Sequence, residues 1–531
     1  MARGYDASLS WDYNILYDGV GAGFASYGVL VDWNNDGDFS DANENITDDV
    51  LSISTAQGRS LASQITGNAI AGLCEIQLKN NTGKYSSFNT SSALSGNILP
   101  NRAVKITTDT PSTETIFYGF LESIVPSVDP MGITTAKLIA LGSLKRFATT
   151  NVSVPMTTSS RTGVVVGAIL DAVGWGAGDR TIATGQTTIN RFYADNTNAL
   201  KVLREVEATE AGFIREGKDG KIIFEDRQHR YTATKSITSQ ATYSDASGAS
   251  LSYTGIIQRD PLDLIFNRFI GSVKTEAVGS LATLWTHPVA NTSGDAPKIK
   301  IGEAVTIIAE YPNEITANDQ TSVNAWTTPA STTDYLTNTA QNGTGTNTTG
   351  SMTVAVVKAS KTMEIKITNG HTADVYLTKL QARGTPVTAS NTVKVLAEDS
   401  TSQTSYGLRE YPSGSEAKWI PDQEEANDWS RYHLSAHKDP TATITIHINA
   451  NESTAGMQKA LELDVSDRIT VTASNNVKLG LSRDFFIETI RHRISAGGKH
   501  NLQLDLSDTS GYAGFWVVGT SKLGLETRLA Y

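Results

Sequence analysis

The sequence predicts a mainly β, multidomain protein that also contains α+β modules. Short runs of alternating or apolar residues, each bounded by Asn, Gly, Pro or Ser, recur along most of the chain and are typical of half-buried strands in a sandwich or barrel. Apolar residues at helical spacing occur in a few segments between these runs. At 531 residues, the chain is long enough for about three or four domains.

Charge and cysteine content exclude some classes of protein. The formal net charge of −11 repels phosphate backbones, so we expect no stable binding to nucleic acid. The single cysteine, Cys74, lies in the alternating run LCEIQL and is predicted to be a buried strand residue without a disulfide partner. No apolar signal-peptide core and no run of 18 apolar residues is present, so neither export by a standard signal nor a membrane span is expected.

The first distinctive stretch is an acidic loop after the predicted strand YGVLVDW at residues 27–33. It reproduces the beginning of a D-x-N-x-D-G calcium loop, whose alternating side-chain oxygens converge on a hard cation. The match weakens at position twelve, which is Asn43, and no helix clearly enters or leaves the loop. A solvated turn is the alternative interpretation. The candidate calcium ligands are Asp32, Asn34, Asp36, Asp38 and Glu44.

Residues 1–148 are predicted to form an N-terminal β domain, and residues 149–272 a helix-plus-sheet module. In the module, apolar residues predict one helix over 161–173 and a second that begins after the cap residues 196–198. We expect the second helix to end near Gly212, because glycine takes the left-handed conformation that closes helices. Two short strands should follow, joined by a turn at Asp219-Gly220.

Residues 273–394 interrupt this pattern and predict an inserted antiparallel β domain. Residues 395–510 are then predicted to form a second helix-plus-sheet module, with a helix over 422–437 and strands such as TATITIHI and HNLQLDL. The last segment, 511–531, is apolar around residues 515–518 and is predicted to be a docking tail.

No catalytic residue and no cofactor site is predicted. The run 212–218 satisfies G-x-x-x-x-G-K, but Asp219 replaces the Ser or Thr of a phosphate loop, and the run enters a hairpin instead of a helix. His433 and His437 share a helical face but lack a third metal ligand, so we expect a surface or core-edge pair. The glutamates at 205, 207 and 210 are expected to form a solvated helix face.

The order of several short motifs resembles that of tail-tip proteins from tailed bacteriophages, the baseplate hub or minor tail protein family. The resemblance covers roughly residues 27–272 and 395–531. It implies hub-like β-barrel or sandwich domains that surround an axial channel. It is carried by Gly58-Arg59, the turn 78–86 (LKNNTGKYS), the step 99–106 (LPNRAVKI), Tyr118-Gly119-Phe120-Leu121, Gly174-Trp175, Asp179-Arg180, the strand 184–189 and Arg191-Phe192-Tyr193.

The same resemblance implies a function and partners. A hub closes the tail tube as a ring, with a homotrimer expected, and anchors distal tail, tape-measure and receptor-binding or fibre proteins. It takes part in host attachment and DNA ejection, and it is located in the virion after synthesis in the host cytoplasm. Accessory domains on phage tails can bind surface glycans, so a carbohydrate-binding adhesin and a cell-wall hydrolase are the alternatives. The aromatics that could stack on a glycan are Trp285, Trp326, Tyr335 and Tyr376, although core or interface positions are the commoner role of such residues.

Overall fold

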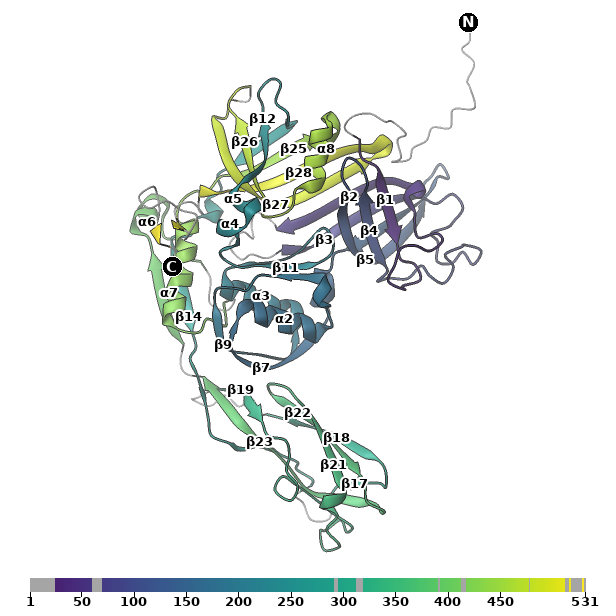
Figure 1. Ribbon diagram of the computed structural model, residues 1–531, viewed down its shortest axis with the longest axis vertical. Coiled ribbons are helices and arrows are strands. Elements are labelled where there is room, and N and C mark those ends of the chain that lie inside the picture. Colours follow the sequence, from purple (N-terminus) through teal and green to yellow (C-terminus); the bar gives the residue numbers. More distant parts are fainter. Residues whose placement is uncertain are drawn as a thin grey trace.

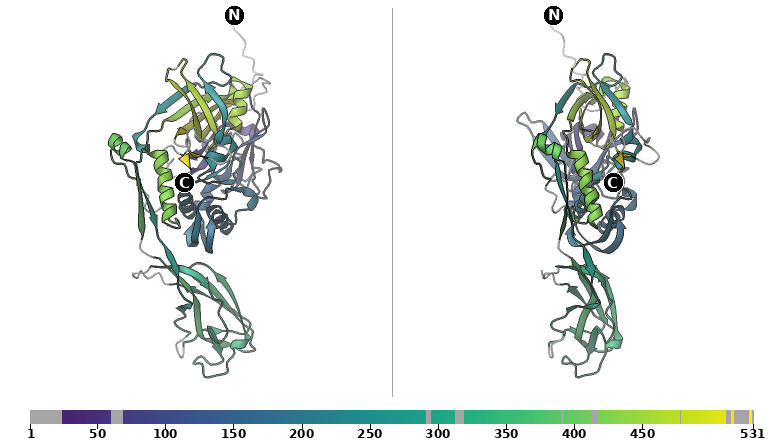
Figure 2. Two further views of the ribbon diagram at one scale, coloured as in Figure 1. Left: turned by 60° about the vertical axis from the view of Figure 1, so that its left-hand side comes forward. Right: turned by 90° about the vertical axis from the view of Figure 1, so that its left-hand side faces the viewer.

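The protein consists of a broad body and one domain that projects from it (Figures 1 and 2). The computed structural model describes residues 24–59, 69–290, 295–311, 319–389, 392–411, 417–476 and 478–510, together with two short strands near the C-terminus. Strands dominate the described residues, as predicted, and they form several separate sheets.

Twelve strands of the body belong to one sheet. Its order is β1-β4-β5-β6-β3-β2-β27-β28-β25-β13, and β26 pairs with both β27 and β12. Its pairings are antiparallel except for the parallel pair β12–β26. Strands from the beginning, middle and end of the sequence therefore share one sheet. Their bounds are β1 Tyr27–Val31, β2 Val50–Arg59, β3 Ala69–Lys79, β4 Ala103–Thr108, β5 Glu114–Val128, β6 Thr134–Leu141, β12 Ser239–Ser244, β13 Gly255–Arg259, β25 Thr443–Asn449, β26 Arg468–Ala473, β27 Leu481–Ser495 and β28 Lys499–Asp508.

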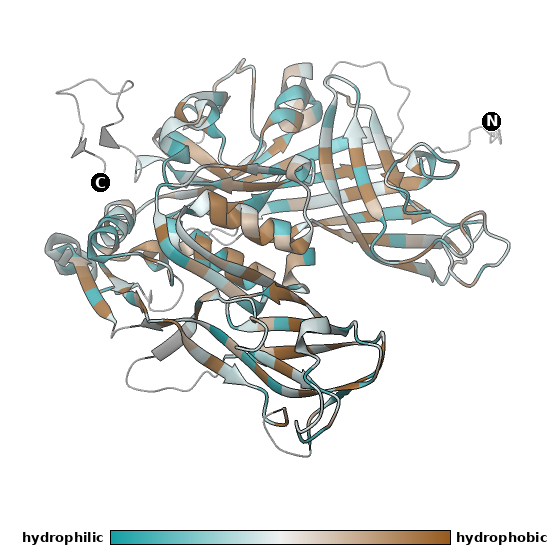
Figure 3. Cartoon of the chain, turned by 60° about the horizontal axis from the view of Figure 1, so that its bottom comes forward, coloured by the Kyte–Doolittle hydropathy of each residue, from teal (hydrophilic) through white to brown (hydrophobic). Residues whose placement is uncertain are grey.

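Alternation of apolar and polar residues explains these strands. Cys74 and Ile76 of β3, Ile446 of β25 and Leu504 of β28 point into the same core cluster and are fully buried. Their neighbours in sequence face the other side, so brown and teal alternate along the strands in Figure 3. The predicted strand position of Cys74 is confirmed.

The sheet joins distant parts of the chain at the pair β2–β27, where Gly58 lies opposite Thr489. Gly58 has a φ of +113°, and a Cβ at this position would collide with the backbone carbonyl of Glu488. Only glycine fits there. The Gly58-Arg59 motif therefore has a structural reason at the closest approach of the two chain segments.

The helix-plus-sheet module packs two helices against strands from the same region. Residues 165, 166, 169, 170, 202, 203 and 206 supply buried apolar side chains to its core. The side chain of Asn198 accepts a hydrogen bond from Lys201 N (3.0 Å) and caps the second helix, as predicted. The elements are α1 Leu144–Ala148, β7 Asn151–Arg161, α2 Thr162–Val173, β8 Arg180–Ile182, β9 Thr188–Asn198, α3 Ala199–Glu210, β10 Phe213–Glu216 and β11 Ile222–Glu225.

The end of α3 differs from the prediction by one residue. Ala211, with φ of +56°, takes the left-handed position that was expected of Gly212. Gly212 instead lies against the backbone carbonyl of Glu225, where a Cβ would collide. The glycine is needed for close approach, and the helix ends on an alanine.

The projecting domain is built from strands of residues 276–389, within the range 273–394 for which the sequence suggested an inserted domain. Strands β14 (Arg268–Val273) and β24 (Val393–Glu398) pair with each other where the chain leaves and re-enters the body. Beyond them, the long strand β23 pairs with β15, β16, β17, β19 and β20, and a second sheet has the order β18-β22-β21. The other bounds are β15 Glu276–Val278, β16 Ala282–Thr286, β17 Lys298–Ile299, β18 Ala304–Glu310, β19 Asp319–Trp326, β20 Tyr335–Asn338, β21 Met352–Lys358, β22 Thr362–Asn369 and β23 Val375–Ala389.

The predicted helix at 422–437 is α7 (Gln423–His437), capped by the Asp422 side chain, which accepts from Glu425 N at 2.9 Å. It packs against β14 and β24 at the base of the insertion, whereas the strands that follow it join the large sheet. His433 and His437 are buried beside Phe269 rather than at the surface, and burial lowers the pKa of His437 to about 4. The remaining helices are α4 His229–Thr232, α5 Thr234–Ile237, α6 Ser400–Tyr406 and α8 Thr454–Glu462.

The predicted docking tail at 511–531 lies outside the described residues, apart from the backbone of β29 (Phe515–Trp516) and β30 (Arg528–Leu529), which pair in parallel. Among the helices of the described residues, none is long and apolar enough to cross a membrane.

Candidate functional site

The turn between β10 and β11, at residues 217–221, lies where three parts of the body meet. Lys218 Nζ donates to the carbonyl of Leu461 at the end of α8 (2.5 Å) and lies 3.2 Å from Glu114 Oε2 of β5. Gly220, at a φ of +84°, lies against the ring of Tyr118. The sequence that resembles a phosphate loop is therefore a contact point between modules, with its lysine already engaged.

A buried carboxylate of β27 binds two arginines. Glu488 of β27 pairs with Arg230 of α4 (Nη1–Oε1 2.8 Å) and with Arg59 of β2, and it accepts a hydrogen bond from Ser507 (2.5 Å). Both guanidinium groups also lie over the ring of Phe213. Burial alone raises the pKa of Glu488, but the two guanidinium groups outweigh it and hold this pKa below its usual value.

A second buried ion pair links the hairpin to the C-terminal part of the chain. Arg215 of β10 pairs with Glu225 of β11 (2.7 Å) and with Asp464 (3.1 Å), while Ser466 donates to Glu225 (2.6 Å). Burial opposes ionisation of Glu225, but Arg215 brings its pKa down to about 2. Glu225 is therefore a permanently charged structural group at neutral pH.

The glutamates of α3 do not form the solvated face that the sequence suggested. Glu207 and Glu210 are both fully buried. Glu207 pairs with Arg204 (2.6 Å) and accepts from Ile214 N, and burial raises its pKa to about 7. Glu210 accepts from Thr187 N at 2.9 Å. Tertiary packing places α3 between two layers, so its acidic side is internal.

Glu216 is a further buried carboxylate, and it holds two segments of main chain. It accepts hydrogen bonds from Gly72 N and from Leu144 N (2.9 Å) at the beginning of α1. Burial raises its pKa to about 7. Like Glu207, it is perturbed by burial and is occupied with protein groups, which is the pattern of an internal structural acid.

Sequence reasoning did not identify Arg59, Arg230 or Glu488 as a cluster. The available signal was a lone glutamate inside the apolar strand FFIETI at 485–490. A carboxylate buried among such residues requires a cationic partner. The partners come from segments more than 250 residues away in sequence, which local patterns cannot reveal.

A cavity of about 430 Å³ lies elsewhere, beside β12 and β13, and is lined by Asp245, Tyr253 and Asn476 among others. The Asp245 carboxylate accepts from Asn475 N at 3.0 Å and from Asn476 N. The lining contains one carboxylate, so it does not hold the pair of carboxyl groups that glycoside hydrolysis uses.

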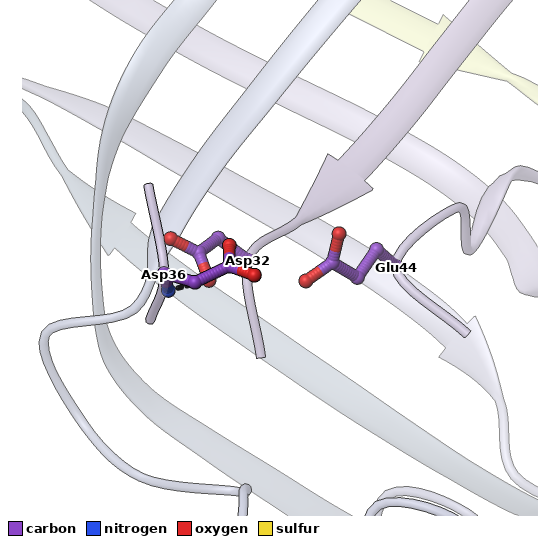
Figure 4. A group of neighbouring side chains, drawn as sticks. All are labelled: Asp32, Asp36 and Glu44. Carbon is purple, nitrogen blue, oxygen red and sulfur yellow. Dashed lines mark hydrogen bonds between the residues drawn. The ribbon is translucent and has the colours of Figure 1, made fainter. Parts of the chain in front are cut away.

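The acidic loop brings together three of its five candidate ligands. Ligand oxygens of Asp32, Asp36 and Glu44 all lie within 4.8 Å of one another (Figure 4). Asn34 directs its amide nitrogen to Asp36 Oδ2 (2.9 Å), and Asp38 accepts from Ser40 N (2.8 Å). Asp38 is not among the three converging carboxylates, and the Asn34 side chain contacts them through its amide nitrogen.

Glu44, one residue later than the motif requires, is the most buried of the three acids. Glu44 is 1% exposed and Asp32 is 3% exposed, whereas Asp36 is exposed. Burial raises the pKa of Glu44, and the charges of Asp32, Asp41 and Asp36 raise it further, against a hydrogen bond from Asp41 N that lowers it.

The aromatic residues predicted as glycan contacts do not form one face. Trp326 and Tyr335 are 5% and 6% exposed and belong to the core of the inserted domain, so their rings are not available for stacking on a sugar. Trp326 Nε1 donates to the carbonyl of Ala359 (2.9 Å). Trp285 and Tyr376 are half-buried and lie on different strands, β16 and β23.

The motif residues of the N-terminal domain build its turns. The Asn80 side chain accepts from Tyr85 N (3.0 Å), Tyr85 is fully buried, and Lys84 pairs with Asp49 (2.9 Å). Gly83 supplies the positive φ of +69° within this turn. The motif thus folds residues 80–86 back onto the segment that precedes β2.

Comparisons with known proteins give matches at the level of structure only. No protein-family model matches the sequence, and no curated protein is significantly similar to it. The 43 kDa tail protein of prophage MuSo2 from Shewanella oneidensis has 8% identity and a TM-score of 0.45, over 91% of this chain and 99% of that chain. The tail protein from Neisseria meningitidis MC58 has 8% identity and a TM-score of 0.47, over 91% and 96%.

A component of the Escherichia coli type VI secretion system, itself described as structurally similar to tail proteins of bacteriophage T4, has 8% identity and a TM-score of 0.37, over 88% of this chain and 76% of that chain. Each of these likenesses is distant and concerns the fold alone.

Proposed function

We propose that the chain is a structural protein of a phage tail tip, a baseplate hub that closes the tail tube and anchors other tip or receptor-binding proteins. The observation that carries this proposal is the ordered series of hub-like motifs along the sequence. Gly58, Gly83 and Tyr85 of these motifs each have a defined part in the N-terminal sheet. The motifs therefore serve the architecture of a scaffold.

The way the insertion is attached supports an anchoring role. Arg268–Val273 pairs along its whole length with Val393–Glu398, so the chain leaves and re-enters the body at one point. The body can then form a ring contact while the insertion extends outward to other tip proteins or to the host surface. In this proposal the net charge of −11 keeps DNA from adhering to the channel during ejection.

A homotrimeric ring needs an exposed apolar contact, and the hairpin of β5 and β6 offers one. Val125, Val128, Met131 and Ile133 are 49%, 67%, 88% and 55% exposed near its tip. Exposed apolar side chains on both faces of a projecting hairpin can insert between neighbouring subunits. We take a second copy of the chain as the occupant of this hairpin.

Size-exclusion chromatography with multi-angle light scattering on the purified full-length protein tests the ring. We expect a species of three times 56.8 kDa, and Val128→Lys combined with Met131→Lys should convert it to monomer. Val164→Lys is the matched control, because Val164 is also exposed (59%) but lies on α2. A trimer that survives the double substitution refutes the hairpin contact, and a wild-type monomer at tens of micromolar refutes the ring.

Immunogold labelling of intact particles tests the location. We expect label at the tail tip of virions, and the particles should lose that label when the gene is deleted. Purified virions that lack the protein would refute the proposed function, whatever its oligomeric state in solution.

A further inference from the structure

The acidic loop at residues 32–44 has the geometry of a cation site. Calcium binds oxygen ligands at about 2.3–2.6 Å, so ligand atoms around one ion are at most about 5 Å apart. The three carboxylates of Asp32, Asp36 and Glu44 meet this limit, because their ligand atoms lie within 4.8 Å of one another. They come from both ends of the loop, next to β1 and before β2 (Figure 4).

An independent observation concerns the oxygens of Glu44. Oε2 accepts a hydrogen bond from Asp41 N (3.0 Å), but Oε1 is buried without a hydrogen-bond partner. The Glu44 carboxylate points toward Asp32 (Figure 4). A buried carboxylate oxygen without a partner is costly, and a bound ion would remove that cost.

The local charge is also uncompensated by protein groups. Among the ion pairs of the described residues, none involves Asp32, Asp36 or Glu44, although lysines and arginines pair with acids at many other places in the fold. Both oxygens of Asp32 accept from the backbone, Oδ1 from Asn35 N (2.5 Å) and Asp36 N (3.2 Å) and Oδ2 from Gly37 N (3.1 Å), but these donors carry no net charge. Nothing described in the structure supplies a positive charge at the point where the acids meet.

We propose that this loop binds one Ca²⁺ ion through the carboxylates of Asp32, Asp36 and Glu44. The ligands are all oxygen atoms, with no histidine or cysteine, which favours a hard cation over zinc. Calcium accepts the irregular geometry of such a loop more readily than magnesium, which requires a near-ideal octahedron at about 2.0–2.1 Å. The inference is independent of the proposed tail-tip function.

Binding would stabilise a loop that reaches the contact point between modules. Phe39, inside the loop, packs edge-on against Tyr118 of β5 (ring centroids 6.4 Å apart), and Tyr118 lies against Gly220 of the β10–β11 turn. Trp33 Nε1 donates to the carbonyl of Asn43 (3.1 Å) and spans the loop from within. A bound Ca²⁺ ion would hold the two ends of the same loop together more strongly than this hydrogen bond does.

Terbium luminescence tests the site on the full-length protein. Tb³⁺ substitutes for Ca²⁺, and Trp33, directly after Asp32 in the chain, should sensitise its emission. We expect Ca²⁺ to displace Tb³⁺ with a dissociation constant on the order of 10⁻⁴ M, in the range of weaker calcium modules, and Mg²⁺ to compete much less. Saturating Ca²⁺ should raise the melting temperature, and a chelator should reverse the rise.

Three isosteric substitutions make the test specific. Glu44→Gln and Asp36→Asn should each weaken Ca²⁺ binding at least tenfold, and Glu44→Gln can still accept the hydrogen bond from Asp41 N. Asp38→Asn is the matched control, because it removes the same charge from the same loop and can keep the bond to Ser40 N; we expect less than a threefold change. Circular dichroism checks that each variant is folded.

Two results would overturn the proposal. One is the absence of Ca²⁺-displaceable Tb³⁺ emission in the folded wild-type protein at millimolar Ca²⁺. The other is an equal loss of affinity in Asp38→Asn and Glu44→Gln, which would indicate diffuse electrostatic attraction instead of a defined site.

Discussion

The substitution Glu488→Gln tests whether the buried charge cluster holds the body together. It retains the shape of the side chain but removes the negative charge that Arg59 and Arg230 share. All three side chains are at most 3% exposed in these pairs, so water cannot replace the lost partner. Breaking a buried ion pair by removal of one member typically costs about 3–5 kcal/mol, and we expect the free energy of unfolding to fall by about that amount.

The arrangement also predicts which of the substitutions in this cluster lowers the free energy of unfolding more. Arg59→Met leaves Glu488 paired with Arg230, so it should cost less than Glu488→Gln, which leaves two buried cations. The matched control is Glu75→Gln in the same sheet, because Glu75 pairs with Lys137 at 2.7 Å while 38% exposed. Exposed pairs contribute only about 0.2–1 kcal/mol.

Urea unfolding, followed by tryptophan fluorescence and far-ultraviolet circular dichroism, measures all three variants. The reasoning is refuted if Glu488→Gln lies within about 1 kcal/mol of Glu75→Gln, because a solvated or redundant carboxylate would behave in that way.

Three further predictions concern other parts of the fold. The pKa of Glu216 is raised from 4.5 to about 7, so the stability that its protonated form contributes is complete below pH 4.5 and is lost as pH rises through 7. In urea titrations, the free energy of unfolding of the wild type should therefore fall by roughly 3 kcal/mol between pH 5 and pH 8 because of this group, and Glu216→Gln should remove that fall. An unchanged pH slope in the variant would contradict this. Gly220→Val should lower the melting temperature by several degrees, since a side chain at its positive φ collides with Tyr118; a variant as stable as the wild type would show that the turn can move. Replacing residues 274–392 by Asn-Gly should leave a folded body, because β14 and β24 already pair at Val273 and Val393. Insoluble protein, or the loss of its helix and sheet signals in circular dichroism, would mean that the body needs the insertion in order to fold.

Local sequence patterns were sufficient to predict many helices and strands and part of the candidate site. Alternation identified strands such as β4 and β25, and helical spacing together with the Asn198 cap identified α3. The D-x-N-x-D-G spacing led to the loop that brings Asp32 and Asp36 together. These features depend on neighbours a few residues away, which the sequence displays directly.

Contacts between distant segments decided the rest. The sequence alone indicated that α3 has an acidic side, but only the packed structure buries Glu207 and Glu210 there. Likewise, helical periodicity established α7, while tertiary packing placed it on β14 and β24 and not on the strands that follow it. The physical reason is that a repeating pattern specifies which face of an element must be buried, whereas its partner depends on the joint burial of apolar area and the pairing of charges across the whole chain.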